Sequence, residues 1–355
     1  MKILQVITDT DRRGAQTFAM DLGDALRAEG ESVRTVALTP GKQSSPLNVE
    51  VLGARRRGPA TLRALRSKMK TSDVTIAHGS ATLMACAIAG FPGERFVYRQ
   101  ISDSRFWANS LGRRLRTALS LRRASQIVAL SDEAQQTLID HVWAPRSRLT
   151  VIPNGVPIGE FRRPTPEERS RARLDLGLVD ESYVVLSIGA LVPEKGVDIA
   201  IDALAELEDP VLVVAGDGPD RERLEMRAQN KLPRRYRFVG AVDHPFRIYA
   251  CADVVVLPSK GGDSMPATLI EAGLCGLPAI ATPVGSIEDV VVDGATGVIV
   301  PSGDATGFHL ALERLLHEPE LGRLLGDAAA SRCSQYFEIR PVARRWIEAL
   351  HYYKT

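Results

Sequence analysis

The chain of 355 residues is long enough for two domains of ordinary size, each with a hydrophobic core of its own. Apolar residues make up 45% of it and the formal net charge is +2, which indicates a soluble globular protein and argues against nucleic acid as a partner. No apolar run is as long as a membrane span, and the charged residues soon after MKILQVIT argue against a signal peptide. Four scattered cysteines without a C-x-x-C pair favour a cytoplasmic location.

Short β-rich runs alternate with helical patterns in the first half of the chain, which is typical of a parallel sheet built from βαβ units. A helix is expected over 15–29, ending at Gly30, and another over 132–141, capped by Ser131. The expected strands are 2–8, 33–38, 49–52, 73–78, 96–99, 126–130 and 149–152. The stretch 161–172, rich in proline, arginine and glutamate, predicts a domain boundary near residue 165.

The same alternation starts again after this boundary and predicts a second doubly wound sheet. Its expected strands are 183–188, 211–215, 236–239, 254–257, 278–281 and 297–300. Helices are expected over 304–316 and 319–335, followed by a third that contains Trp346 and Leu350.

Two carboxylates in the second half lie on either side of an expected helix start. Asp263 lies in a loop, and Glu271 follows eight positions later in a helix predicted over 266–275. The free N–H groups at the start of a helix, together with the helix dipole, form a site suited to an anion. Acids on both sides of a phosphate site suit a ligand with hydroxyls at both ends and phosphate in the middle, and a nucleotide-sugar has that layout.

Other nucleotide motifs fail on their spacing. Gly216-Asp-Gly218 follows a strand, but the third glycine of a dinucleotide fingerprint is replaced by Arg221, which argues against a dehydrogenase. Gly53 and Gly58 have P-loop spacing without the following Lys-Ser/Thr. No cluster of His, Cys, Asp or Glu has metal-ligand spacing, so no metal site and no cofactor are expected.

Two basic tracts, 54–70 and 112–123, belong to the first half. In the second tract, Leu115 and Leu119 interleave with arginines. Such a helix can lie on anionic lipid headgroups, or it can pack on its own sheet as an ordinary amphipathic helix. We therefore expect a cytoplasmic protein that binds peripherally to the inner face of the cell membrane.

The stretch D-SMPATLI-EA, which spans Asp263 to Ala272, is followed by Gly276-Leu-Pro278 and Gly285-Ser-Ile-Glu288. This order resembles the donor-binding signature of glycosyltransferase family 4, in which a glutamate usually stands at the position of Asp263. The resemblance implies the GT-B fold, with two Rossmann-like, doubly wound parallel-sheet domains facing across a cleft. It also implies an acceptor-binding domain over 1–165, a nucleotide-sugar-binding domain over 166–337, and a C-terminal helix within 338–355 that crosses back to the first domain.

The resemblance extends to the donor site. The run VLSIGALVPEKG over 185–196 is similar to the family's Gly-Arg-Leu-x-x-x-Lys-Gly motif, with Ala190 in place of the arginine. It implies that Lys195 and the amides of Ala267 and Thr268 hold the donor diphosphate. The alternative for Lys195 is an ordinary solvent-exposed lysine at the start of a helix. Glu271 would bind the ribose and Asp263 a sugar hydroxyl. The full set of implied donor-binding residues is Gly189, Lys195, Asp263, Met265, Ala267, Thr268 and Glu271.

On the acceptor side, Gly14 and Gln16 resemble the family's glycine-rich loop, with Arg13 replacing its first glycine, but a plain strand-to-helix turn would look similar. His78 matches a strand-end histidine of the family, with a buried structural imidazole as the alternative. The family's next histidine is absent, and Arg99 or Asp103 would take over its contacts. The resemblance thus implies Gly14, Gln16, Arg99 and Asp103 as acceptor-binding residues and Asp263, Lys195 and His78 as catalytic residues.

The implied activity is metal-independent, retaining transfer of a sugar from a nucleoside-diphosphate sugar to a saccharide acceptor, with a lipid-linked acceptor of bacterial surface polysaccharide or lipopolysaccharide assembly preferred. Two alternatives stay open at this point. One is a sugar-nucleotide epimerase or phosphorylase of the same fold. The other is a non-catalytic binding or scaffold relative, which the departures at Ala190, Asp263 and the absent histidine favour.

Overall fold

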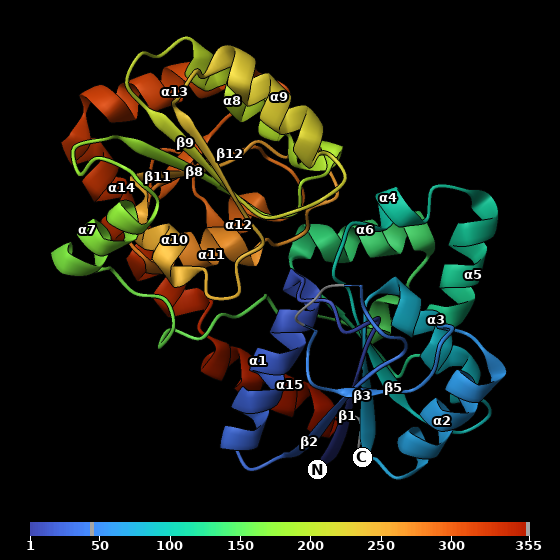
Figure 1. Ribbon diagram of the computed structural model, residues 1–355. Coiled ribbons are helices and arrows are strands. Elements are labelled where there is room, and N and C mark those ends of the chain that lie inside the picture. Colours follow the sequence, from blue (N-terminus) through green and yellow to red (C-terminus); the bar gives the residue numbers. More distant parts are fainter. Residues whose placement is uncertain (43–45, 353–355) are drawn as a thin grey trace. The chain divides into compact units, whose positions relative to one another are not determined.

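The computed structural model of the chain describes residues 1–42 and 46–352, and the last residues of the expected segment 338–355 lie outside this range (Figure 1). The chain forms two compact units. The first contains Met1–Pro157 and the C-terminal segment from Phe337 onward, and the second is Ile158–Tyr336.

The first unit contains a seven-stranded, fully parallel sheet in the order β3-β2-β1-β4-β5-β6-β7. The strand order reverses between β1 and β4, which makes this point the topological switch of a doubly wound sheet. The strands are β1 Lys2–Ile7, β2 Ser32–Ala37, β3 Glu50–Val51, β4 Val74–His78, β5 Phe96–Arg99, β6 Gln126–Ala129 and β7 Leu149–Val151.

Helices cover both faces of this sheet. They are α1 Gly14–Ala28, α2 Pro59–Lys70, α3 Ser80–Ala89, α4 Ser104–Trp107, α5 Leu111–Leu121, α6 Asp132–Val142, the 3-10 turn Arg146–Arg148 and α15 Ile339–Tyr352. The last helix, α15, packs against α1, and its Trp346 is fully buried in a core shared with Phe18 of α1 and Ile76 of β4. The C-terminal helix therefore forms part of the first unit.

The second unit contains a six-stranded parallel sheet in the order β10-β9-β8-β11-β12-β13, which reverses between β8 and β11. The strands are β8 Val184–Ile188, β9 Val211–Ala215, β10 Tyr236–Gly240, β11 Val254–Leu257, β12 Ala279–Ala281 and β13 Gly297–Ile299. The helical segments are α7 Pro166–Asp175, the 3-10 turn Pro193–Lys195, α8 Val197–Ala205, α9 Arg221–Lys231, α10 Phe246–Cys251, α11 Ala267–Leu274, α12 Ile287–Val290, α13 Ala305–His317 and α14 Pro319–Tyr336.

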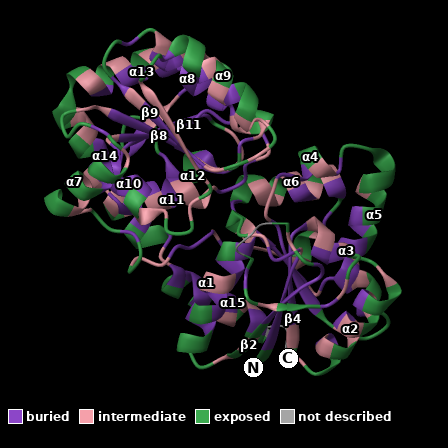
Figure 2. Cartoon of the chain, in the orientation of Figure 1, coloured by how far each residue is buried: buried purple, intermediate pink, exposed green. Residues whose placement is uncertain are grey.

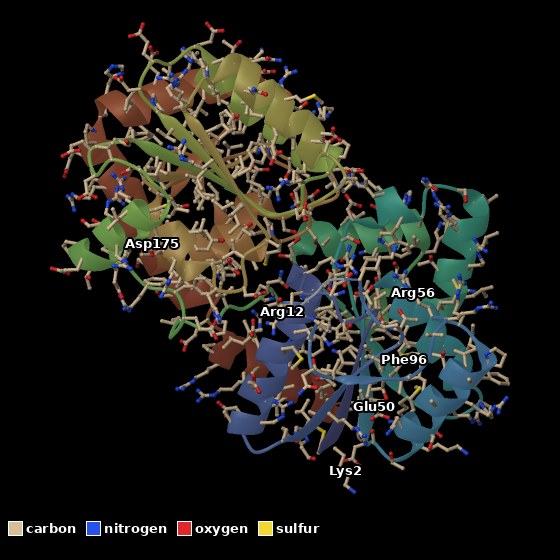
Figure 3. All side chains as sticks on the ribbon, viewed as in Figure 1. Lys2, Arg12, Glu50, Arg56, Phe96 and Asp175 are labelled. Atoms are coloured by element: carbon tan, nitrogen blue, oxygen red, sulfur yellow. The ribbon has the colours of Figure 1, made fainter. Side chains whose placement is uncertain are left out.

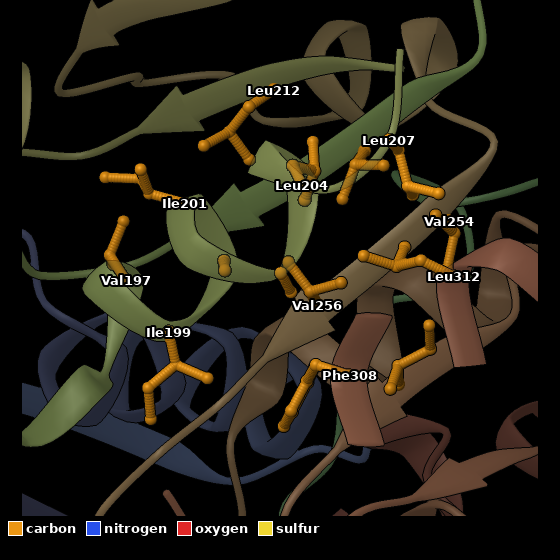
Figure 4. Packing of buried hydrophobic residues seen from close by; sticks show 14 of the residues in the cluster. Val197, Ile199, Ile201, Leu204, Leu207, Leu212, Val254, Val256, Phe308 and Leu312 are labelled. Carbon is orange, nitrogen blue, oxygen red and sulfur yellow. The ribbon is translucent and has the colours of Figure 1, made fainter. Parts of the chain in front are cut away.

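The core of the second unit lies between its sheet and helices α8 and α13 (Figure 4). Figure 4 shows side chains of this cluster, among them Ile201 and Leu204 of α8, Val254 and Val256 of β11 and Phe308 of α13. Strands in both units are largely buried and the outer helix faces are exposed (Figure 2), as expected of parallel sheets covered on both sides.

These two sheets confirm the expected fold class. Every expected strand is present within two residues of its predicted ends, and the helix predicted over 266–275 forms as α11. None of the described helices is long and apolar enough to cross a bilayer.

Candidate functional site

The switch point of the second sheet brings Lys195 and Asp263 together. Lys195 ends the turn that follows β8, and Asp263 lies in the loop that follows the neighbouring strand β11. The Lys195 ammonium forms an ion pair with Oδ1 of Asp263, and the Ser259 hydroxyl donates to Oδ2. The two loops are also joined through the backbone, because the amide of Lys260 donates to the carbonyl of Glu194 at 2.7 Å. Ligands of open α/β sheets bind at such a switch point.

The backbone between Lys195 and α8 requires a glycine. Gly196 has a φ of +65°, and a Cβ there would lie 2.0 Å from the carbonyl oxygen of Pro258. The turn that carries Lys195 therefore packs directly on the loop that leads to Asp263. In contrast, a Cβ built on Gly189 would have Cε of Lys195 as its nearest atom, at 4.0 Å. There is therefore unfilled space between the Gly189 backbone and the Lys195 side chain.

Helix α11 begins directly after the Asp263 loop. Its N-cap is Pro266, no side chain caps it, and its first turn contains no acidic residue. The N–H groups of Ala267 and Thr268 precede the first intrahelical hydrogen bonds and can bind an anion. Met265 is buried beneath this start, and the amide of Ser286 fixes the loop by donating to the carbonyl of Ser264 at 2.6 Å.

Glu271, one turn into α11, differs from Asp263 in its surroundings. Oε2 of Glu271 accepts a hydrogen bond of 2.6 Å from the Tyr249 hydroxyl of α10, and no cation is paired with it within the described part of the chain. Burial raises the pKa of the Glu271 carboxyl to about 7, although the hydrogen bond from Tyr249 opposes the shift. Asp263 is thus held by a cation, whereas Glu271 is left to accept hydrogen bonds from neutral donors.

Glu271→Gln is expected to change how stability depends on pH. The pKa of Glu271 rises from 4.5 to about 7 on folding, so the folded chain keeps a proton that the unfolded chain releases in this window. Stability should fall by up to about 3 kcal/mol as the pH rises through the window and level off above it. Unfolding midpoints at pH 5, 6, 7 and 8 should show this loss in the wild type and in a control Glu288→Gln, at an exposed position. If Glu271→Gln lost stability over the same pH range, the pH dependence could not be assigned to the Glu271 carboxyl.

His78 ends β4 within the first unit, and both of its ring nitrogens are engaged by neighbouring side chains. Nε2 lies 2.8 Å from Oε1 of Gln5, and Nδ1 lies 3.4 Å from Nη1 of Arg99. The ring is buried, and burial lowers its pKa well below the usual value, so the imidazole is neutral. This arrangement suits a positioning role better than direct proton transfer.

The loop after β1 is held by Asp9, a buried carboxylate that sequence reasoning missed. Asp9 accepts hydrogen bonds from Nε2 of Gln16 at 2.9 Å, Nη2 of Arg13 at 2.6 Å and Nη2 of Arg56 at 3.2 Å. A Cβ built on Gly14 would have nothing within 4 Å, so the start of α1 is open. Asp103 caps α4 by accepting a hydrogen bond from the amide of Arg105 at 2.8 Å.

The structure thus places the predicted residues in separate groups. The donor-side residues lie along the β8 and β11 loops and α11, His78 lies beside Arg99, and Gln16 lies beside Asp9. Sequence reasoning also missed Ser259 and Tyr249. Ser259 lies in the loop with Asp263, and Tyr249 lies on another helix, where no spacing pattern links it to Glu271. No group of His, Cys, Asp or Glu in the described ranges could hold a metal ion.

Two family models match the chain. Residues 12–160 match the model described as Glycosyltransferase Family 4, and residues 168–332 match the model described as Glycosyl transferases group 1. Among curated relatives, the chain is 28% identical over 285 residues to a D-inositol 3-phosphate glycosyltransferase of Nocardia farcinica, covering 76% of this chain and 59% of the relative. It is 30% identical over 219 residues to the alpha-D-kanosaminyltransferase of Streptomyces kanamyceticus, covering 59% of this chain and 56% of the relative. The chain therefore spans little more than half the length of these relatives.

Among solved structures, Anabaena Alr3699/HepE in complex with UDP-glucose is similar over 99% of both chains, with a TM-score of 0.89 and 23% identity. WaaG, described as a glycosyltransferase involved in lipopolysaccharide biosynthesis, is similar over 98% of this chain and 99% of its own, with a TM-score of 0.77 and 17% identity. These likenesses support the GT-B fold.

Proposed function

Since this chain is a member of glycosyltransferase family 4, we propose that it transfers a sugar from a nucleoside-diphosphate sugar to a saccharide acceptor, with retention and without a metal ion. The observation that carries the proposal is the grouping of Lys195, Asp263 and the start of α11 at the switch point of the second sheet. A cation and free N–H groups suit a diphosphate, and carboxylates beside them suit the hydroxyls of sugar and ribose.

The reaction breaks the bond between the anomeric carbon and the diphosphate oxygen and forms a bond from that carbon to an acceptor hydroxyl oxygen. The acceptor proton passes to the departing diphosphate, which gains the electron pair of the broken bond. The protein then has to position the reactants and stabilise the charge that develops on the diphosphate. In this scheme Lys195 and the amides of Ala267 and Thr268 supply that stabilisation, and Lys195 exchanges its contact with Asp263 for one with the phosphate.

UDP-glucose is the first donor to test, because a similar structure holds it. For the acceptor, the names of similar proteins support two classes, a phosphorylated polyol and a saccharide of lipopolysaccharide assembly. Lipid-linked intermediates of surface polysaccharide assembly contain both phosphate groups and sugar hydroxyls, and so resemble both classes. A protein that uses them works at the inner face of a membrane.

Helix α5 offers a surface for such a membrane. Leu111, Leu115 and Leu119 are spaced four residues apart and are 49–65% exposed, while Ala118 and Leu121 face the core. The helix therefore presents a second apolar stripe outward, with arginines beside it, rather than packing all its leucines on the sheet. We propose that this stripe and its arginines contact anionic lipid.

Replacing Arg113, Arg114 and Arg116 with Gln is expected to abolish binding to anionic vesicles without changing donor affinity. Binding of the wild type should weaken with salt, since surface charge is screened within about 8 Å at physiological ionic strength. Vesicle flotation measures this, with a control that removes three exposed arginines of the second unit, Arg171, Arg314 and Arg323. Equal binding of the wild type to neutral and anionic vesicles would contradict the proposed contact of α5 with anionic lipid.

A thermal-shift screen against nucleotide-sugars tests the donor, because a ligand that binds only the folded state raises the melting temperature. The proposal expects a shift with one nucleotide-sugar, and slow hydrolysis of that donor when no acceptor is present. Ala190, where the family has an arginine, favours a second candidate, a donor-binding relative without catalysis. A shift with no hydrolysis and no transfer would support this second candidate.

A further inference from the structure

Asp9 joins two arginines that lie far apart in the sequence. Asp9 is 3% exposed, and its carboxylate contacts Arg13 from the loop after β1 and Arg56 from the segment before α2. Figure 3 shows Arg56, and Arg12 next to Arg13 in the sequence, at the end of the first unit that lies away from Lys2 at the start of β1. This is the end at which the parallel strands finish, where ligands of such sheets bind.

Both guanidinium groups are available to a ligand. Each side chain is 53% exposed, and each uses only Nη2 to contact Asp9; Nη2 of Arg13 also lies 3.4 Å from Oδ2 of Asp11. The Nε and Nη1 groups of Arg13 and Arg56 have no hydrogen-bond partner within residues 1–42 and 46–352. The buried Asp9 carboxylate thus holds two half-exposed guanidinium groups in place and leaves their Nε and Nη1 hydrogen-bond donors free.

A third arginine lies under the first turns of α1. Arg99 is 2% exposed, and its guanidinium stacks 3.7 Å from the centre of the Phe18 ring. Its hydrogen-bond partners are the neutral groups of His78 and Asn154, and its Nε has none in the described structure. No carboxylate pairs with it among the described residues, although buried charges are normally paired.

The first turns of α1 contact both features. Gln16 donates to Asp9, and Phe18 covers Arg99. The first unit therefore carries a buried arginine with no carboxylate partner in the described structure, and two half-exposed arginines whose Nε and Nη1 groups are unpaired in the described ranges.

We propose that the acceptor carries a phosphate group, and that Arg13 and Arg56, oriented by Asp9, bind it at the open start of α1, the helix whose Phe18 covers Arg99. The inference rests on the proposed glycosyltransferase function and names the chemical class of its acceptor. Arginine suits this task because its planar fork presents parallel donors to phosphate oxygens. The open space at Gly14 lets a phosphate approach the first N–H groups of α1.

Isothermal titration with matched probes tests the proposal on the full chain saturated with UDP. The probes are myo-inositol and its 3-phosphate, glycerol and glycerol 3-phosphate, and farnesyl diphosphate in micelles. At least one phosphate-bearing probe should bind ten times more tightly than its neutral counterpart or than empty micelles. Arg13→Gln and Arg56→Gln should each weaken that binding at least tenfold, and Arg56→Lys should restore part of it. Preference for farnesyl diphosphate would identify a lipid-linked acceptor, and preference for a polyol phosphate a soluble one.

Arg55→Gln and Arg57→Gln are matched controls, since they remove the same charge from exposed positions in the same tract without a contact to Asp9. Both should bind the probe like the wild type. The proposal is overturned if no phosphate-bearing probe binds, if neutral probes bind equally well, or if Arg55→Gln weakens binding as much as Arg56→Gln. UDP-glucose affinity is measured on the same protein preparations before UDP is added. Its absence would contradict the proposed function, whereas its presence without phosphate binding would contradict only this inference.

Discussion

Lys195→Ala is expected to lower kcat/KM for sugar transfer roughly 100- to 1,000-fold, as removal of one preorganised charge-stabilising group does in other enzymes. The effect should be this large because Lys195 is the cation paired with Asp263, and position 190 carries an alanine and so supplies no second cation. Initial rates with UDP-glucose, or with the donor that the thermal screen identifies, measure it. Lys195→Arg should recover part of the rate.

Lys260→Ala is the matched control for this prediction. Lys260 lies in the same loop as Asp263, but its ammonium pairs with Asp198 at 2.8 Å and its side chain is 41% exposed. Its loss should change the rate less than about threefold, since exposed ion pairs contribute little. Equal losses in the two variants would mean that general surface charge, rather than a fixed diphosphate contact, accounts for the effect.

Gly216→Ala is expected to destabilise the second unit by about 3 kcal/mol or more. Gly216 directly follows β9 and has a φ of +134°, and a Cβ there would lie 1.8 Å from the carbonyl oxygen of Gly189. Both partners are backbone and Gly189 follows β8, so the clash cannot be relieved by a side-chain rotation. Thermal unfolding should show the loss, and UDP affinity should fall with it, because Gly189 lies next to Lys195.

Gly262→Ala separates this clash from backbone strain alone. Gly262 has a φ of +78°, but a Cβ there would have nothing within 4 Å. Only the cost of a left-handed conformation applies, about 1–2 kcal/mol. If Gly262→Ala proved as destabilising as Gly216→Ala, the close approach of β9 to Gly189 would not be the cause.

The sheets could be predicted from the sequence because parallel strands are buried on both faces and appear as short apolar runs. VVLSI at β8 and VVVL at β11 are examples. The helix start was predicted at Pro266, and the structure places Pro266 at the N-cap, one residue before α11. That Lys195 and Asp263 belong to one site was implied only by the family resemblance, and their ion pair was not predicted. The two residues are 68 positions apart, and the strand order brings their loops together.

The partners that tune the site could not be predicted. Tyr249 reaches Glu271 from another helix, and Arg56 reaches Asp9 across 47 positions, so no local period links either pair. His78 shows a related difficulty. Its place at the end of β4 was correct, but its engagement by Gln5 and Arg99 depends on which strands are neighbours.

The two acids of the donor site are expected to divide their work. Asp263 is paired with Lys195, whereas Glu271 accepts from Tyr249 and has no paired cation in the described structure. A carboxylate that binds a ribose diol contributes roughly 1.5–3 kcal/mol, or about ten- to a hundredfold in affinity. Asp263→Asn frees Lys195 for the diphosphate, so UDP should bind no more weakly than before, while binding or turnover of UDP-glucose falls.

Isothermal titration of UDP and UDP-glucose into the wild type, Glu271→Gln and Asp263→Asn tests the proposed donor site most directly. We expect Glu271→Gln to weaken both ligands about ten- to a hundredfold, and Asp263→Asn to weaken only UDP-glucose. If both variants weaken UDP equally, or if the wild type binds neither ligand, the nucleotide-sugar is not held at the switch point of the second sheet as proposed.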